Sequence, residues 1–115
     1  MDQWTDYESR IEADIDRIIT VLDGLQTTCT FFVLGWIAEH HPTVVHSLVA
    51  AGHEVATHGY GHVVLDQQTR DEFTADLDRS IAAIEQAGGN VEGYRAPGFV
   101  SQTWLFEELT ARGFK

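Results

Sequence analysis

Two histidines four residues apart, His58 and His62, directly follow Glu54 to Thr57, a short run that is typical of a β-strand. Neutral imidazole is a good ligand for zinc and other first-row metals, and this spacing brings both rings to one side of a single turn. Gly59 and Gly61 disfavour an ordinary surface helix and let the backbone bend tightly. The spacing therefore predicts two metal ligands. The alternative is a turn with two exposed histidines, because a catalytic zinc normally takes three ligands from protein.

A second group of candidate residues, Arg95-Ala96-Pro97-Gly98, follows another short apolar run later in the chain. Arg95 alone is weak evidence for a site, because most arginines are solvated or paired on a protein surface. Pro97 restricts the backbone of this loop, which would hold the arginine in a fixed place at a strand end. The functional and structural interpretations of Arg95 both remain open at this point.

Length and composition limit the kinds of protein that can carry these residues. The 115 residues fit one domain, and an apolar content of 43% is enough for a modest core. No apolar run approaches the ~18 residues of a membrane span, and no signal-peptide pattern is present. We therefore expect a soluble chain, and the sequence does not indicate its cellular compartment. Cys29 is the single cysteine, which excludes an internal disulfide; its apolar surroundings predict a buried, inert thiol.

The charge balance is strongly acidic, with 18 Asp and Glu against 7 Lys and Arg, a formal net charge of −11. Such a field repels nucleic acid and anionic lipid, so neither is an expected partner. The acidic residues are dispersed along the sequence, which indicates a solvated acidic surface more than an interaction tail.

Hydrophobic periodicity divides the chain into alternating helices and strands. The segment from residue 28 to 34 is almost wholly β-branched or aromatic, which is typical of a strand buried on both faces. The expected elements of the first half are a helix from about Tyr7 to Leu25, a strand Thr28–Leu34, a short helix Trp36–His40, a helix from Pro42 to Gly52 and the strand Glu54–Thr57.

The second half continues the alternation. Thr69-Arg70-Asp71-Glu72 is a capping box that predicts the start of a long helix ending at Gly88. A short strand, Val91–Arg95, and a last helix, Trp104–Arg112, follow. Strands separated by helices imply parallel βαβ units, either as a barrel or as a doubly wound sheet. In such folds ligands bind beyond the carboxyl ends of the strands, which places the histidine pair and Arg95 on the same rim.

Four motifs in this order resemble the polysaccharide deacetylases of carbohydrate esterase family four. They are Thr30-Phe31-Phe32-Val33-Leu34-Gly35, Ala51-Gly52-His53-Glu54, His58-Gly59-Tyr60-Gly61-His62 and Arg95-Ala96-Pro97-Gly98-Phe99. The sequence looks closest to the branch associated with exopolysaccharide clusters, and the resemblance covers nearly the whole chain. It implies an α/β fold, a partial deformed (β/α) barrel with parallel strands, and metal-dependent hydrolysis of N-acetyl groups from the amino sugars of a polysaccharide.

The resemblance also implies roles for individual residues. His58 and His62 match the ligands of the divalent metal, often zinc, and Arg95 matches the arginine that orients the catalytic aspartate. The loop Pro97-Gly98-Phe99 matches the wall that holds the acetate end of the substrate. Two departures stand out: Gly59 replaces a common serine or threonine, and the order Gly98-Phe99 reverses the commoner aromatic-then-glycine order.

Three parts of the family's catalytic set have no match in this sequence. The acidic residues that supply the base and the third metal ligand should precede the first helix, where Met1-Asp2-Gln3-Trp4 contains no such strand. The motifs that supply the acetyl pocket and the acid histidine should lie after Lys115. We therefore expect residues 1–115 to be the central part of the domain, inactive alone. The alternatives are a non-catalytic glycan-binding or interaction module of the same fold, or a hydrolase of small cyclic amides or ureides.

Other polar and aromatic side chains carry weaker hypotheses. Asp66 is the nearest carboxylate after the histidines and therefore a weak candidate for a third ligand. Trp36 and Tyr60 can line a sugar groove by stacking or belong to the core. His53 precedes its strand, on the far rim, where a structural hydrogen bond is expected.

Overall fold

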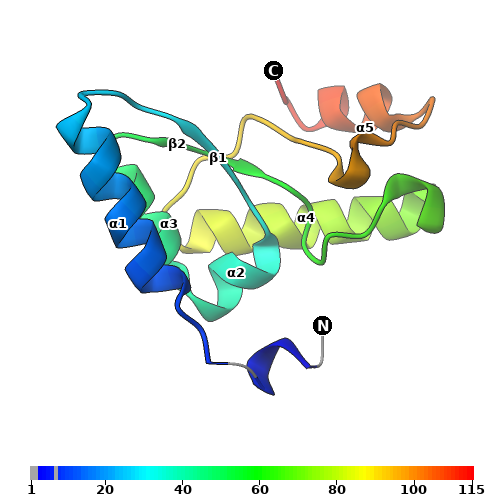
Figure 1. Cartoon of the computed structure of the whole chain (residues 1–115). Helices are drawn as coiled ribbons and strands as arrows, with labels where there is room; N and C mark the ends of the chain where they lie inside the picture. Colours follow the sequence, from blue (N-terminus) through cyan, green and yellow to red (C-terminus); the bar gives the residue numbers. More distant parts are fainter. Residues whose placement is uncertain (1–2, 7) are drawn as a thin grey trace.

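The computed structural model describes residues 3–6 and 8–115 and places helices around a small parallel sheet (Figure 1). Tyr7, where the first helix was expected to begin, lies outside the described residues, and residues 8–10 are not helical. The elements in chain order are η1 Trp4–Asp6, α1 Ile11–Gly24, β1 Thr30–Val33, α2 Gly35–His40, α3 Pro42–Ala50, β2 Glu54–Thr57, η2 Leu65–Gln67, α4 Arg70–Gln86, η3 Pro97–Phe99 and α5 Leu105–Ala111.

The sheet consists of β1 and β2, which run parallel with Thr30 opposite Glu54 and Val33 opposite Thr57. The parallel pairing across a helical crossover confirms the predicted α/β class. The predicted strand Val91–Arg95 is wrong in its extent, because only Tyr94 forms a bridge, to Thr57. The run contains a glycine and ends one residue before the turn at Pro97, so little of it favours extended pairing.

The burial predicted for β1 is also wrong. Val33 is its only buried residue; Phe31 and Phe32 are half-buried and Thr30 is exposed. Within the described residues β1 pairs along one edge only, so its first residues have no second neighbour to cover them. Cys29 precedes the strand and is exposed, so the prediction of a buried thiol fails for the same reason.

Two apolar clusters form the core on either side of the strand ends. The first joins α3, the C-terminal half of α4 and the sheet through buried residues that include Val45, Leu48 and Ile84. The second joins the start of α4 to α5 through Phe73, Leu77 and Leu105 among others. In Figure 1 the long helix α4 spans both, with α1 and α3 at one end and α5 near the other. One rigid helix therefore connects the two halves of the core.

The beginning of α4 is fixed by the predicted capping box, which is confirmed. The Thr69 hydroxyl accepts the Glu72 amide at 3.2 Å, and the Glu72 carboxylate accepts the Thr69 amide at 2.7 Å. These bonds favour the charged carboxylate and lower the pKa of Glu72. The cap sets the register of the helix that lies against the candidate site. None of the helices in residues 3–6 and 8–115 combines the length and apolarity required for a transmembrane segment.

Candidate metal-binding site

The segment from His58 to His62 lies at the carboxyl ends of β1 and β2. The His58 amide donates to Val33 O at 3.0 Å, continuing the pairing of the two strands. The first two amides of α2 then donate to the histidine loop: Gly35 N to Gly59 O at 2.9 Å and Trp36 N to Tyr60 O at 3.1 Å. The loop is therefore joined to the end of β1 as well as to its own strand.

His58 is oriented by the main chain of the second predicted motif. Its Nδ1 lies 2.7 Å from the carbonyl oxygen of Arg95. A carbonyl can only accept, so Nδ1 carries the hydrogen and, in the neutral ring, Nε2 keeps a free lone pair. Metal-ligating histidines usually donate their other ring N–H to such a partner, which fixes the tautomer and the ring orientation.

His62 lies beside His58, with ring centroids 4.9 Å apart and ring planes inclined at 70°. Two imidazoles at this separation can face one ion. His62 has a φ of 59°, a left-handed conformation that costs an L-residue roughly 1–2 kcal/mol. Such a backbone persists only where the surroundings impose it.

No third ligand accompanies the pair in the described part of the chain. Among those residues no group of three or more His, Cys, Asp or Glu side chains is placed to hold a metal ion. Asp66, the weak candidate, is exposed in η2 and belongs to no such group. The pair thus supplies a partial ligand set of the type that zinc accepts.

A carboxylate on α4 holds the backbone between the two histidines. Asp76 Oδ2 accepts the Tyr60 amide at 2.8 Å, and Oδ1 accepts the Gly61 amide at 3.3 Å. Gly59 has a φ of 79°, and a Cβ added there would lie 2.9 Å from Asp76 Oδ2. Glycine therefore fits this position in both conformation and space.

Two buried hydroxyl groups, those of Thr57 and Ser80, form hydrogen bonds with the same loop. Ser80 Oγ lies 3.1 Å from Gly59 O and 2.7 Å from Thr57 Oγ1, while the Gly59 amide donates to Thr57 Oγ1 at 3.2 Å. Since the Gly59 carbonyl accepts from Ser80, the Thr57 hydroxyl must donate to Ser80. Both side chains are fully buried, so each hydrogen bond is made away from water.

Tyr60 is an anchor of the loop and not part of an open groove. Its ring is buried, and its hydroxyl donates to the Glu39 carboxylate at 2.7 Å. The Arg79 guanidinium lies 3.8 Å above the ring and 3.2 Å from Glu39. Burial and the bond to Glu39 raise the pKa of Tyr60 to about 12, and the bond from Tyr60 lowers the pKa of Glu39.

The main chain of Arg95 contacts His58, but its side chain contacts Phe32. Its guanidinium lies 4.1 Å above the ring of Phe32, and the residue is exposed. Of the ion pairs formed by the residues that the structure describes, none involves Arg95. Its predicted role in orienting a catalytic aspartate stays a prediction.

The loop after Arg95 turns through η3. Pro97 is buried, whereas Gly98 and Phe99 have φ values of 67° and 58°. Phe99 is 86% exposed, so its ring packs little against the rest of the described chain. The role of Pro97, Gly98 and Phe99 as a substrate loop also stays a prediction.

Asp76 and Ser80 are the residues of this site that the sequence motifs did not indicate. They are four apart on α4, so they share one face of the helix, directly beside the apolar stripe that includes Leu77 and Ile81. Their position beside a buried apolar stripe is the sequence signal that could have indicated them. That signal does not tell which loop the two side chains contact.

The parallel α/β fold thus brings a histidine pair and a proline-containing loop together at its strand ends. The profile of the family described as polysaccharide deacetylase matches residues 5–113. The chain belongs to this family, which confirms the resemblance seen in the motifs.

Individual relatives agree with this assignment. A peptidoglycan deacetylase-like protein of Gibberella zeae is 32% identical over 119 aligned positions, covering 96% of this chain and 34% of the relative. Chitin deacetylase 1 of Saccharomyces cerevisiae is 29% identical, covering 69% of this chain and 26% of the relative. A candidate polysaccharide deacetylase from Mycobacterium smegmatis superposes with a TM-score of 0.82 at 38% identity, over 87% of this chain and 35% of that one. The chain spans about a third or less of the two curated relatives.

Proposed function

We propose that this chain forms the metal-holding part of an N-deacetylase that removes acetyl groups from the amino sugars of a polysaccharide. The bond from His58 Nδ1 to Arg95 O carries the proposal, because it leaves Nε2 as a lone-pair donor beside His62. The relatives named for chitin and peptidoglycan support the substrate class, since both polymers contain N-acetylated amino sugars. Which glycan is used stays open.

We propose a divalent cation, zinc in the first place, as the cofactor held by His58 and His62. When bound, such an ion polarises an amide carbonyl and lowers the pKa of a water molecule. The chain's own residues hold the two ligands in position, because Arg95 O sets the tautomer of His58, and Asp76 and Ser80 hold the loop that carries His62. No third ligand is grouped with the pair among the described residues, and the motifs that would supply the general base and the general acid have no match in this sequence.

Zinc titration of the purified chain tests the metal site directly. We expect binding of one ion, with affinity reduced at least tenfold in His58→Ala and in His62→Ala, since each removes a ligand. His46→Ala is the matched control, because His46 is an exposed histidine on α3. Equal zinc affinity in the two ligand variants and in the unmodified chain would refute the site.

Acetate release from an acetylated chitooligosaccharide tests the catalytic set. We expect negligible turnover by residues 1–115 alone, because the motifs that would supply the base and the acid have no match in this sequence. Turnover that a chelator abolishes would show that the missing groups lie within the chain. The lack of a third ligand in the described residues also favours one alternative, a non-catalytic glycan-binding module. Tight glycan binding without zinc binding would support that module over the enzyme.

A further inference from the structure

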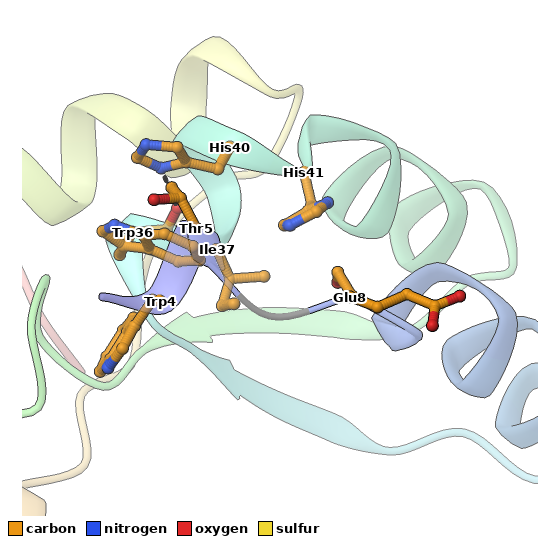
Figure 2. Close-up of a pocket in the computed structure, with 8 residues that line it drawn as sticks. Trp4, Thr5, Glu8, Trp36, Ile37, His40 and His41 are labelled. Carbon is orange, nitrogen blue, oxygen red and sulfur yellow. Dashed lines mark hydrogen bonds between the residues drawn. The ribbon is translucent and has the colours of Figure 1, made fainter. Parts of the chain in front are cut away.

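A cavity of about 340 Å³ lies between η1, α2 and the segment before α1, outside the histidine site (Figure 2). This volume is at the lower end of the range of small-molecule sites. Its walls combine indole rings with polar groups: Trp4, Glu8, Trp36, Ile37, His40 and His41 are among the lining residues. In Figure 2 these side chains come from the N-terminal segment, from α2 and from His41, which follows α2.

The aromatic side chains of this cavity are ordered against one another. Trp36 is only 8% exposed, with the His40 ring stacked on it at 4.2 Å and the Trp4 ring edge-on at 5.0 Å. His40 Nδ1 lies 2.9 Å from the Trp36 carbonyl, so Nδ1 is the donor and the neutral ring keeps Nε2 as an acceptor. Trp4 is 37% exposed. Trp4 therefore presents the more accessible indole surface, and the Trp36 ring lies between Trp4 and His40 (Figure 2).

The cavity adjoins the histidine loop through the backbone of α2. The Trp36 amide donates to Tyr60 O at 3.1 Å, and the preceding amide donates to Gly59 O at 2.9 Å. The residue that forms the base of the cavity is thus bonded directly to the segment between His58 and His62. Because α2 begins two residues after β1 ends, the helix that lines the cavity starts beside the histidine loop.

We propose that this cavity binds a pyranose ring of the glycan, in a unit other than the one whose acetamido group meets the histidine pair. The proposal rests on the proposed function, because only a polymeric sugar substrate extends beyond the reacting unit. A pyranose has an apolar C–H face that packs on an indole and a rim of hydroxyls that needs polar partners. Trp4 offers the first, and Glu8 with the His40 ring offers the second.

Charge selects among sugars. Glu8 at the rim and the net charge of −11 disfavour an anionic unit such as a uronic acid, so the site takes a neutral or cationic amino sugar. An extended apolar ligand fits less well, since Glu8, His40 and His41 would lose water without gaining partners.

The test is an NMR titration of the full chain, labelled at tryptophan, with triacetylchitotriose. The chain has three tryptophans, and the third, Trp104, packs against Phe73 in the second core cluster and serves as an internal control. We expect saturable shifts of the indole N–H signals of Trp4 and Trp36, with no shift for Trp104. Unchanged Trp4 and Trp36 signals at millimolar sugar would overturn the proposal, as would equal shifts of all three indoles.

Variants separate stacking from folding. Trp4→Ala should weaken sugar binding about five- to tenfold, the ratio that an aromatic contact of ~1–1.4 kcal/mol gives, whereas Trp4→Phe retains most of it. Phe106→Ala is the matched control, because Phe106 is an aromatic residue of α5 that is 70% exposed and does not line the cavity. An equal loss in Trp4→Ala and Phe106→Ala would contradict a role for the cavity.

A zinc titration in parallel keeps this proposal distinct from the proposed function. If zinc binds at His58 and His62 but sugar has no effect on Trp4, the sugar-binding proposal is refuted and the metal site is retained. Sugar-dependent shifts of Trp4 in a chain that binds no zinc retain the cavity and remove the metal-dependent function.

Discussion

The two loops at the carboxyl end of the sheet differ in how firmly the fold holds them. The His58–His62 loop is bonded to the β1–α2 junction and, through Asp76 and Ser80, to α4. The 95–99 loop has a backbone bridge to Thr57, a carbonyl bonded to His58 and a buried Pro97, but its arginine and phenylalanine side chains are exposed. Two five-residue motifs at the same end of the sheet thus differ in how firmly their side chains are held.

The difference shows where the rigidity of such a site comes from. The groups that hold the histidine loop lie at the β1–α2 junction and on α4, outside the motif itself, and they act on backbone amides and carbonyls. A ligand set is only as precise as the residues that support it. The histidine loop is therefore expected to be sensitive to changes in α4, and the other loop to be tolerant of changes in its own side chains.

The largest effect is expected from Asp76→Ala. This change leaves the amides of Tyr60 and Gly61 without their acceptor, which should lower the free energy of unfolding by about 1–3 kcal/mol. Zinc affinity should fall roughly 10- to 100-fold, as for other groups that orient metal ligands. Urea denaturation and zinc titration measure the two quantities.

Two further carboxylate variants calibrate this result. Asp76→Asn keeps one acceptor oxygen and should give an intermediate loss. Asp66→Ala changes an exposed carboxylate in η2 and should alter neither quantity. If Asp76→Ala binds zinc as tightly as the unmodified chain, the histidine loop is not held from α4 in the way proposed.

The second effect comes from Gly59→Ser, which restores the hydroxyl common in the family. The φ of 79° and the approach to Asp76 at 2.9 Å predict a loss of about 1–2 kcal/mol in stability, with no gain in zinc affinity. Gly52→Ser is the matched control, because Gly52 has a φ of 83° and no heavy atom near the added Cβ. The difference between the two variants measures the contact with Asp76, and a stabilised Gly59→Ser chain would exclude that contact.

The sequence predicted the elements whose signals are local. The strand Glu54–Thr57, the capping box at Thr69 and the helix beginning at Pro42 agree with the structure, because each depends on neighbours within a few residues. The burial of Phe31 and Phe32 was mispredicted, since it depends on what covers the edge and faces of the strand. The same dependence on distant chain explains the exposed Cys29.

The sequence indicated the two histidines of the candidate site, but not the groups that hold them in position. A pair of histidines at a strand end has a sequence signature, whereas the carbonyl of Arg95 has none, because every residue carries one. The motif drew attention to the guanidinium, but the contact with His58 comes from the main chain. The role of Asp76 depends on where α4 crosses the loop, which periodicity does not reveal.

A smaller effect is expected at alkaline pH from Tyr60. Its pKa is raised to about 12 in the folded chain, against about 10 for an unfolded tyrosine. The unfolded state therefore loses this proton first, so the stability from Tyr60 is complete below pH 10 and is lost as the pH rises toward 12. Tyr60→Phe should flatten this decline, leaving the part due to Tyr94, whose pKa burial also raises. An equally steep decline in the variant would assign the effect elsewhere.

The smallest effect is expected from Arg95→Ala, which changes a side chain of the 95–99 loop, whereas Asp76→Ala removes a support of the histidine loop. The exposed guanidinium lies over the half-buried Phe32 ring and makes none of the described ion pairs, so stability should fall by only about 0.5–1 kcal/mol. The carbonyl that orients His58 is retained in the variant, so zinc affinity should change less than twofold. Arg95→Pro is the informative contrast, because it removes the Arg95 amide that donates to Thr57 O at 3.1 Å and displaces that carbonyl. If alanine and proline weaken zinc binding equally, the side chain of Arg95 and not its backbone supports the metal site, and the two loops are more alike than their contacts indicate.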